Sequence, residues 1–443
     1  MVSAKWMREV LCFLAVVAAV LLCASVEAAL PEGLRAVVEK ELPVSKEPWA
    51  GRTGANGANG AMTLEGGVWC GYQGWFTTEG DGARRPWIHW TKGRGAMVDG
   101  NAKVDLWPDM TELGPGERFA TGFLHADGRT AEVFSSQVPQ TVARHFQWMR
   151  EAGIDGAFVQ RFAEGLRDAV VLEERTRVLA HCREGARKHG RAYAVMYDLT
   201  GVRAGGVAEV AEDWLALQRR LMPEMDPAYL KHRGRPLVAV WGVGFGDGRA
   251  YSLAECRALV EALHAAGCSV MLGVPDGWRT LDRDAASDAT LHEVLAGVEV
   301  VSPWTIGRYG TPAGAQSHGE KVLEPDVAWC RARGVDYLPV VYPGFSWANM
   351  YGGPSDQVPR LRGEFLWSQM AAVKKAGARA LFVAMFDEVD EGTAVFKCTN
   401  EPPVGGQSRF LTYEGLASDF YLWLCGMGGR LMRGEVGAEF PRR

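Results

Sequence analysis

The stretch Leu381-Phe-Val-Ala-Met-Phe-Asp-Glu-Val-Asp-Glu-Gly-Thr393 joins two contrasting kinds of sequence. It opens with six apolar residues, and such a run is typical of a strand that is buried on both faces. Four acids follow within five positions: Asp387, Glu388, Asp390 and Glu391. Neighbouring carboxylates raise one another's pKa values, which makes the cluster electrostatically costly. A chain that keeps it at the end of a core strand is expected to use it, for acid–base chemistry or for a cation.

The spacing of the acids within the cluster favours acid–base chemistry over cation binding. Glu388 and Glu391 are three positions apart, so in a helical turn or tight loop they share a face, with Cβ atoms about 5–6 Å apart. Two carboxyls about 5–9 Å apart suit the cleavage of a glycosidic bond. One alternative is a solvated acidic turn that caps a helix. Another is a Ca²⁺ loop, although the D-x-D-x-D-G spacing of an EF-hand is absent.

The rest of the chain alternates short apolar runs with amphipathic stretches. Strands are predicted at 68–74, 156–162, 192–198, 236–242, 269–274, 299–304, 337–342 and 380–386. Helices are predicted around 138–149 and at 172–189, 206–222, 252–266, 284–296, 320–334, 362–377 and 410–424. This alternation predicts an α/β fold of the (β/α)₈ TIM-barrel class with a single catalytic domain. A doubly wound sheet also alternates, but residues 71–74 lack its phosphate-binding glycine pattern.

The helix around 138–149 has the clearest pattern. Its apolar stripe recurs with helical spacing at Val138, Val142, Phe146 and Met149. Ser135 and Ser136 are expected to cap its first turn, and Gly153 is expected to end it.

In a barrel of this kind the chemistry lies where strands end and the following loops begin. Aromatic or polar residues stand at these ends, and together they suit a sugar cleft, where rings stack on aromatic faces and hydroxyls are hydrogen-bonded. Besides the acids Asp387 and Asp390, the predicted substrate contacts are Tyr72, Trp75, His89, Trp107, Gln160, Arg161, Tyr197, Asp198, Trp241, Trp304, Arg308, Tyr309 and Tyr342.

Several of these residues have a purely structural alternative. Trp241 and Trp304 would serve equally well as caps that pack the barrel against its helices. Other structural roles are a core tyrosine for Tyr72 and Tyr342, an ion pair with a helix acid for Arg308, a helix N-cap for Asp198 and a packing role for His89.

Composition and the N-terminus set the context. The chain has 443 residues and a formal net charge of −5, which gives no reason to expect a nucleic-acid partner. Residues 1–28 have the pattern of a secretory signal, with Lys5 and Arg8 before an apolar run and small residues at Val26 and Ala28. The protein is therefore expected to be secreted or periplasmic, with an uncleaved N-terminal anchor as the alternative. The apolar run is short for a membrane span, and no later stretch is long enough.

The predicted organisation follows from these boundaries. Residues 29–65 form a short helix and a flexible Gly/Ala/Asn-rich linker, 66–430 the barrel, and 431–443 a C-terminal tail. Seven of the nine cysteines lie beyond the signal. Their odd number and the absence of a C-x-x-C pair argue against a disulfide framework and against a zinc site. We expect most of these seven to be buried small hydrophobic residues and expect no cofactor or metal.

Residues 386–393, F-D-E-V-D-E-G-T, resemble the F-N-E-W-H-E-G-T segment of glycoside hydrolase family 99. The resemblance extends through 66–430 and includes family 71-like secreted proteins. It implies a (β/α)₈ barrel related to endo-acting α-mannosidases and α-mannanases. Glu388 then corresponds to the glutamate that deprotonates the sugar 2-hydroxyl, which attacks C1 with overall retention. Glu391 corresponds to the general acid.

This chain departs from the family segment at Asp387, Val389 and Asp390, which replace asparagine, tryptophan and histidine. The first-strand segment Trp69–Trp75 also differs from the family's Y-Y-P-W-Y type. The sequence therefore predicts a secreted retaining glycoside hydrolase that cleaves an α-linked oligo- or polysaccharide, mannan-like or related. The alternative, suggested by positions 389 and 390, is a glycan-binding barrel without hydrolytic activity.

Overall fold

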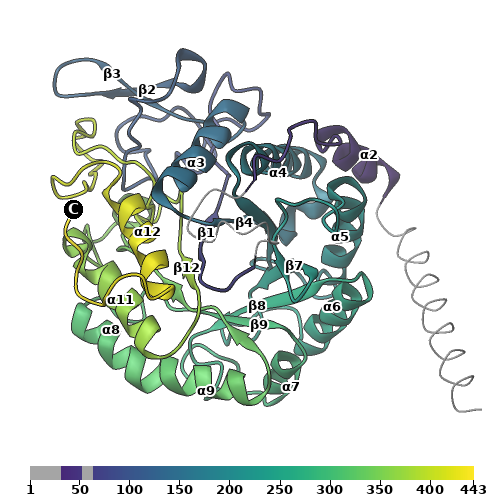
Figure 1. Cartoon of the computed structure of the whole chain (residues 1–443). Helices are drawn as coiled ribbons and strands as arrows, with labels where there is room; N and C mark the ends of the chain where they lie inside the picture. The colour runs from purple at the N-terminus through teal and green to yellow at the C-terminus, as the bar shows by residue number, and fades with distance from the viewer. Residues whose placement is uncertain (1–30, 52–62) are drawn as a thin grey trace, which may run out of the picture.

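The computed structural model describes residues 31–51 and 63–443. The predicted signal segment and the linker beyond Gly51 lie outside the described residues. From residue 63 onward the chain forms a ring of parallel strands that is surrounded by helices (Figure 1). This is the predicted (β/α)₈ TIM-barrel fold.

The strands of the ring run parallel to their neighbours and are almost entirely buried. Burial on both faces explains why their sequences are nearly continuous apolar runs. In chain order they are β1 (Val68–Tyr72), β4 (Gly156–Phe162), β5 (Ala192–Asp198), β7 (Arg235–Trp241), β8 (Ser269–Pro275), β9 (Val300–Trp304), β10 (Asp336–Tyr337), β11 (Val340–Val341) and β12 (Leu381–Val383). A short strand, β6 (Lys231–His232), pairs antiparallel with the start of β7.

The ring closes through the seventh predicted strand, which is split into β10 and β11. β10 pairs with β9, and β11 pairs with β12. Between them, the Leu338 amide donates to the Val301 carbonyl at 2.9 Å, and the Phe382 amide donates to the Pro339 carbonyl at 3.0 Å. Pro339 has no N–H to donate, so a continuous ladder cannot pass through it. The segment instead bonds to β9 before Pro339 and to β12 from Pro339 onward.

Helices cover the outside of the strand ring and form a closed outer layer. The layer is closed because the last helix, α12, packs against both α11 and α3 (Figure 1). They are α3 (Pro139–Ala152), α4 (Ala169–His189), α5 (Ala208–Leu221), α6 (Leu253–Ala265), α7 (Thr290–Ala296), α8 (Pro312–His318), α9 (Glu324–Ala332), α11 (Glu364–Lys375) and α12 (Phe420–Met432). The one-turn helix α10 (Ala348–Tyr351) lies instead on the loop after β11. Short helical turns are η1 (Pro115–Glu117), η2 (Ala163–Arg167), η3 (Gly319–Leu323) and η4 (Leu361–Gly363).

Helix α3 follows its predicted stripe, but its predicted cap is wrong. The helix begins at Pro139 after Val138, and no side chain caps it. Ser135 instead donates to Asp81 at 2.6 Å and accepts from the Gln137 amide at 3.0 Å, so its hydroxyl is used in the preceding loop. The helix ends at Gly153, which has a φ of 83°, as the sequence predicts.

Two predicted helices begin later than expected. α12 starts at Phe420 and not at 410, because Glu414 and Gly415 adopt left-handed φ angles of 56° and 76° that interrupt a helix. α7 starts at Thr290 and not at 284. The preceding residues pair with the loop after β7, where the Gly246 amide donates to the Asp284 carbonyl at 2.8 Å.

The long loop after β1 carries a hairpin of its own, β2 (Phe119–Leu124) paired antiparallel with β3 (Thr130–Val133). At the other end of the chain, the predicted tail from residue 431 turns back on the barrel. The Trp367 indole donates to the Ala438 carbonyl at 2.8 Å, and Arg443 pairs with Asp419 at 2.6 Å.

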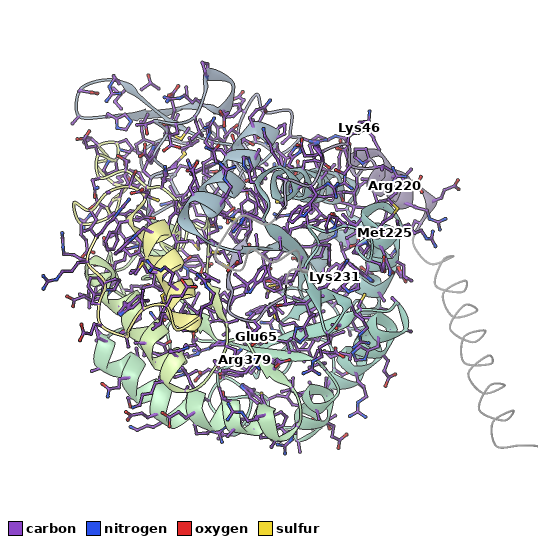
Figure 2. The ribbon with its side chains drawn as sticks, in the orientation of Figure 1. Lys46, Glu65, Arg220, Met225, Lys231 and Arg379 are labelled. Atoms are coloured by element: carbon purple, nitrogen blue, oxygen red, sulfur yellow. The ribbon has the colours of Figure 1, made fainter. Side chains whose placement is uncertain are left out.

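Residues 31–51 dock on the outer helices. In α2 (Glu32–Glu41), Leu34 and Val38 are buried where the helix packs against α4. Arg220 donates to the Leu42 carbonyl at 3.1 Å, and Figure 2 shows Arg220 and Lys46 at this edge. Within the described residues, no helix is both long and apolar enough to cross a membrane. The seven cysteines after the signal segment are buried free thiols, as predicted.

The contact between α12 and α3 depends on Gly426. A Cβ at this position would lie 1.8 Å from the Ala152 carbonyl oxygen. We expect Gly426→Ala to lower the free energy of unfolding by about 1–3 kcal/mol, because the helices must move apart. Urea denaturation followed by tryptophan fluorescence measures this. Gly33→Ala is the control, since its Cβ meets nothing within 4 Å; equal losses in both variants would contradict the close contact.

Candidate active site

Asp387 joins the end of the eighth strand to the end of the first. Its Oδ1 accepts from the Gln73 amide at 2.8 Å, and its Oδ2 accepts from the Gly74 amide at 2.9 Å. Burial raises the pKa of Asp387 to about 7, although the two N–H groups act in the opposite direction. β12 itself ends at Val383, earlier than predicted, but the Phe386 amide still donates to the Gly71 carbonyl at 2.8 Å. The acids therefore start from a fixed point at the carboxyl end of the barrel.

The acids stand on a closed turn. The Glu388 carbonyl accepts from the Thr393 amide at 3.2 Å and from the Ala394 amide at 3.1 Å. Gly392 has a φ of 65°, and a Cβ there would lie 3.1 Å from the Ser346 amide nitrogen. Only glycine combines this conformation with so close an approach. The structure therefore contains the tight loop that the spacing of Glu388 and Glu391 predicts.

Both side-chain oxygens of Glu388 are occupied by donors. Gln73 Nε2 donates to Oε1 at 2.6 Å, and Thr393 Oγ1 donates to Oε2 at 2.7 Å. Burial, followed by the charges of Glu391 and Asp390, raises the pKa of Glu388 well above its usual value. These two donors hold the carboxyl group in one orientation while its neighbours favour the protonated form.

Glu391 lies on the same turn and is also affected by its surroundings. Burial raises its pKa to about 7, and the charge of Asp390 acts in the same direction. A hydrogen bond from Trp347 and the charge of Lys103 oppose this increase. Both glutamates therefore hold protons more tightly than an exposed glutamate does. One carboxyl can then donate a proton while the other accepts one.

Asp390 is fully buried and is held by the first loop. Its Oδ2 lies 2.8 Å from His89 Nδ1 and 3.3 Å from Lys103 Nζ. Burial lowers the pKa of His89 to about 4, so the ring is neutral at pH 7. His89 has a φ of 62°, which is uncommon for a residue other than glycine. This backbone conformation directs the imidazole toward the acidic turn.

His89 is also the first member of a stack of rings. It lies against Trp75 with ring centroids 3.5 Å apart, and Trp75 lies against Phe162 at 5.4 Å. The guanidinium of Arg175, on α4, is 5.2 Å from the Phe162 ring. This His89–Arg175 stack brings the predicted contacts Trp75 and His89 to one side of the acidic turn.

A second aromatic group lies across β8. Trp241 ends β7 and Trp304 ends β9, yet their rings are 5.5 Å apart in an edge-to-face arrangement. Gly273 on the intervening strand makes this contact possible, since a Cβ there would lie 2.5 Å from the Trp241 ring. Both indoles are partly exposed, so they offer a surface as well as a packing contact.

Several predicted contacts point toward the helices and do not reach the acidic turn. Arg161 and Tyr197 both bind Asp213 on α5, at 2.6 and 2.7 Å. The Tyr72 hydroxyl bonds to His145 at 2.9 Å and is a core tyrosine. In a strand, successive side chains point to opposite faces, so a residue that faces the helices alternates with one that faces the barrel interior. The type of a residue at a strand end therefore did not predict whether its side chain faces the site.

Further predicted residues have structural partners as well. Tyr309 bonds to Gln369 on α11 at 3.2 Å, and the Tyr342 hydroxyl donates to the Tyr309 carbonyl. Trp107 packs against Phe123 and Phe410 in the first loop.

Three more predicted contacts lie around the strand ends. Arg308 pairs with Asp284 at 2.6 Å, and Asp198 accepts from the Thr200 amide at 2.7 Å. Gln160 contacts the sulfur of Met196 on the next strand at 3.2 Å.

Arg360 fixes the acidic turn from outside but has no signal in the sequence. It donates to the Gly392 and Ala394 carbonyls, each at 2.7 Å. Its guanidinium lies over the rings of Tyr413 and Tyr421, at 4.9 and 4.5 Å. Lys103, Arg175 and Thr393 were also missed as site residues, and Gln73 and Trp347, which stand at strand ends, were not included among the predicted contacts. Gln73 and Thr393 adjoin recognised segments and could have been inferred, whereas Lys103 and Arg175 come from a loop and a helix far away in sequence.

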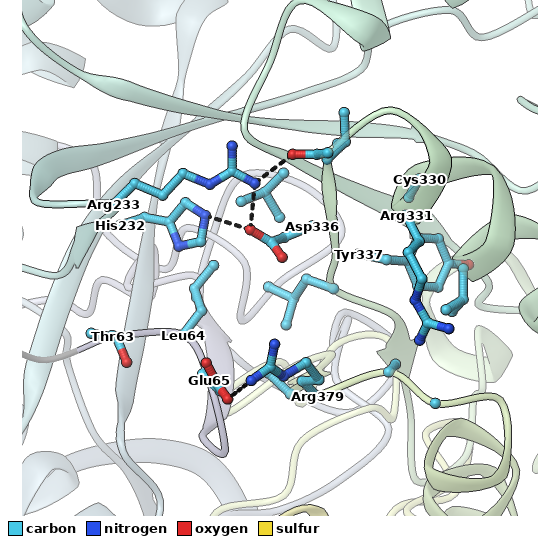
Figure 3. A pocket seen from close by; sticks show the side chains of 18 residues that line it. Thr63, Leu64, Glu65, His232, Arg233, Cys330, Arg331, Asp336, Tyr337 and Arg379 are labelled. Atoms are coloured by element: carbon cyan, nitrogen blue, oxygen red, sulfur yellow. Dashed lines mark hydrogen bonds and ion pairs between the residues drawn. The ribbon is translucent and has the colours of Figure 1, made fainter.

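Within the described residues, no group of three or more His, Cys, Asp or Glu side chains is arranged to hold a metal ion. A cavity of about 530 Å³ lies at the opposite, N-terminal end of the strands (Figure 3). Apart from Arg331, its charged side chains are paired with one another: Asp336 binds His232 at 3.0 Å and Arg233 at 2.8 Å, and Glu65 pairs with Arg379. It shares no residue with the acidic turn.

Comparison with solved structures identifies similar folds. The chain superposes on a family 99 endo-α-mannosidase from Bacteroides thetaiotaomicron with a TM-score of 0.61 and 16% identity, covering 84% of this chain and 98% of that one. A complex of that enzyme with bis-tris propane gives a TM-score of 0.58 at 17% identity, with the same coverage. A glycoside hydrolase-like protein gives 0.53 at 11% identity and covers 88% and 98%. No protein-family model and no curated protein matches the sequence. At these identities the likeness establishes the shared fold.

The acidic turn should depend on Arg360 for its stability. We expect Arg360→Met to lower the free energy of unfolding by about 2–4 kcal/mol, because two buried carbonyl oxygens lose a charged donor. Chemical denaturation at pH 7 measures the loss. Arg409→Met, at an exposed arginine on a neighbouring loop, is the control and should change stability by about 0.5 kcal/mol or less. An equally small effect at Arg360 would show that the turn holds without it.

Proposed function

We propose that this protein is a retaining glycoside hydrolase that cleaves an α-linked glycan, mannan-like or a related polysaccharide. The observation that carries the proposal is the pair Glu388 and Glu391. The two carboxyls lie on one tight turn at the carboxyl end of a TIM barrel, and both have raised pKa values. Paired carboxyls with shifted pKa values are the machinery of glycosidic bond cleavage.

The roles of the two carboxyls follow the resemblance to family 99. Glu391 protonates the leaving oxygen and later activates water, which requires a carboxyl that is still protonated near neutral pH. Glu388 takes the proton of the sugar 2-hydroxyl, and the resulting oxygen attacks C1. The donors from Gln73 and Thr393 support this assignment, because they favour the ionised form of Glu388 against the effect of burial and hold its carboxylate in a single orientation.

Aromatic surfaces around the turn support a sugar ligand. Trp241 and Trp304 present partly exposed indole faces at neighbouring strand ends. On the loop before α10, Trp347 adjoins Glu391 and packs edge-to-face on the more exposed Tyr351 at 5.2 Å. Such faces stack on the C–H surfaces of sugar rings.

The departures from the family segment have local explanations. Val389 is fully buried, and its carbonyl accepts from the amides of Asp105 and Leu106 at 2.9 and 3.2 Å. It anchors the first loop and is not available to a substrate. Asp390, in place of a histidine, is bound by His89 from that same loop. We therefore expect substrate contacts on this side to differ from those of the family.

We also propose that the protein is exported, on the strength of the sequence of residues 1–28 alone. A polysaccharide substrate outside the cytoplasm is consistent with such an address.

Substitution of the paired glutamates tests the proposal. We expect Glu391→Gln and Glu388→Gln each to lower hydrolysis by at least about a hundredfold, because each removes a proton-transfer group. Mass analysis of products from α-mannans, α-glucans and mixed plant glycans measures this. Glu401→Gln, at an exposed acid, should retain full activity. If wild type binds glycans on an array but releases no product, the non-hydrolytic binding barrel is the better assignment.

Hydrolysis should also depend on pH through Glu391. Its pKa of about 7 predicts that kcat/KM falls as pH rises above about 7, because the acid loses its proton. Asp390 raises this pKa, so Asp390→Asn should lower it and move the alkaline limb to lower pH. A pH–rate profile measures the shift. Asp127→Asn, in an exposed hairpin turn, should leave the profile unchanged, and an alkaline limb that ignores Asp390 would reject the assignment.

A further inference from the structure

A cavity of about 390 Å³ opens beside the acidic turn, next to the His89–Arg175 stack. Its lining includes the rings of Trp75, His89 and Phe162 and the guanidinium groups of Arg85 and Arg175, together with the exposed acids Glu164 and Asp168. The cavity is therefore bounded by aromatic faces and a partly buried guanidinium. It lies on the side of the site where the sequence departs from family 99.

Arg175 is poorly satisfied by the protein. Within residues 31–51 and 63–443 it forms no ion pair, and its guanidinium makes a single long hydrogen bond, from Nη1 to the Gln73 carbonyl at 3.4 Å. Its Nε is buried and has no hydrogen-bond partner in this part of the chain. The neighbouring Arg85 contrasts with it, because Glu174 accepts from its Nε at 2.8 Å and also pairs with its Nη2.

The two acids of the lining, Glu164 and Asp168, form no ion pair with Arg175. Asp168 accepts from the amides of Val170 and Val171 at the start of α4, at 2.8 and 3.1 Å. Glu164 is exposed to solvent. Burial, followed by the charge of Arg85, lowers the pKa of Arg175 to about 10, so the group still carries its charge at neutral pH. The charges of Glu174 and Asp387 act in the opposite direction, but Glu174 is paired with Arg85, and neither acid forms an ion pair with Arg175 among the described residues. A desolvated cation without a paired counter-charge is costly for a protein to keep.

We propose that this cavity binds an anionic substituent of the glycan, a carboxylate or a sulfate ester, with Arg175 as the recognising cation. The planar fork of a guanidinium suits both oxyanions. The inference rests on the proposed function, since it names the substrate class of the same site. Gln73 links the cavity to the acidic turn, because its carbonyl accepts from Arg175 and its side chain donates to Glu388. One bound glycan can therefore place an anion at Arg175 and a glycosidic bond at the acidic turn.

Binding of small sugars to the full chain tests the proposal without requiring hydrolysis. The probes are methyl α-D-glucuronide, glucose 6-sulfate and the neutral methyl α-D-glucoside, measured by calorimetry with wild type, Arg175→Gln and Arg84→Ala. We expect wild type to bind one anionic probe at least about tenfold more tightly than the neutral one, because a charge-assisted pair forms. Arg175→Gln should lose this preference. Arg84→Ala should keep it, since Arg84 is exposed and pairs only with Glu173 at 3.2 Å among the described residues.

Each other outcome decides against the proposal. Equal binding of anionic and neutral probes by wild type, or no binding of either anionic probe, rejects it. A preference that survives Arg175→Gln also rejects it. If Arg175 only supports Gln73, the variant weakens all probes equally and the ratio stays unchanged. The preferred anionic probe distinguishes carboxylate from sulfate. An anion preference that persists in Glu391→Gln, together with wild type that hydrolyses nothing, would reject the hydrolase and retain the anion site.

Discussion

The carboxylate of Asp387 holds the two ends of the barrel together. Its oxygens accept from consecutive backbone amides, those of Gln73 and Gly74, which leave the first strand more than 300 positions earlier in the chain. A barrel has no free edge only if its last strand meets its first in the correct register. Asp387 stabilises that meeting at the end where the strands open. The same contact brings Gln73 within reach of Glu388, so the bonds that close the ring also help to build the acidic turn.

The turn tolerates four acids because each receives donors from a different source. Two backbone amides after β1 serve Asp387, and a glutamine and a threonine serve Glu388. Asp390 is bound by the first loop, and Glu391 receives a hydrogen bond from Trp347. Buried carboxyls without such partners would be far more costly. Because the donors come from separate elements, the charge density of the site depends on the whole ring being in place.

Sequence periodicity was sufficient for the fold and for the acidic turn, but not for the walls of the site. The apolar run before Asp387 and the spacing of Glu388 and Glu391 are local properties, and local patterns can be read directly. Arg161 and Tyr197 show the limit. Both stand at strand ends, as a substrate contact would, yet they face Asp213 on a covering helix. A strand of period two places alternate residues on opposite faces, so a shift of one position reverses the assignment. Arg175 and Arg360 depend on tertiary contacts alone, and no spacing in the sequence indicates them.

Because β12 must pair with β1, the acidic turn cannot form on a growing or shortened chain. A ribosome that has released the first seven strands has produced most of the hydrophobic core, but neither Glu388 nor the turn that holds it. A fragment that lacks β1 loses Gln73 and the partners of Asp387. A partial product of synthesis or of proteolysis that lacks either β1 with Gln73 or the segment after β12 therefore lacks the complete acidic turn. The split strand of β10 and β11 lies next to this final contact, so the last part of the ring to be synthesised is also the part that completes the acidic turn.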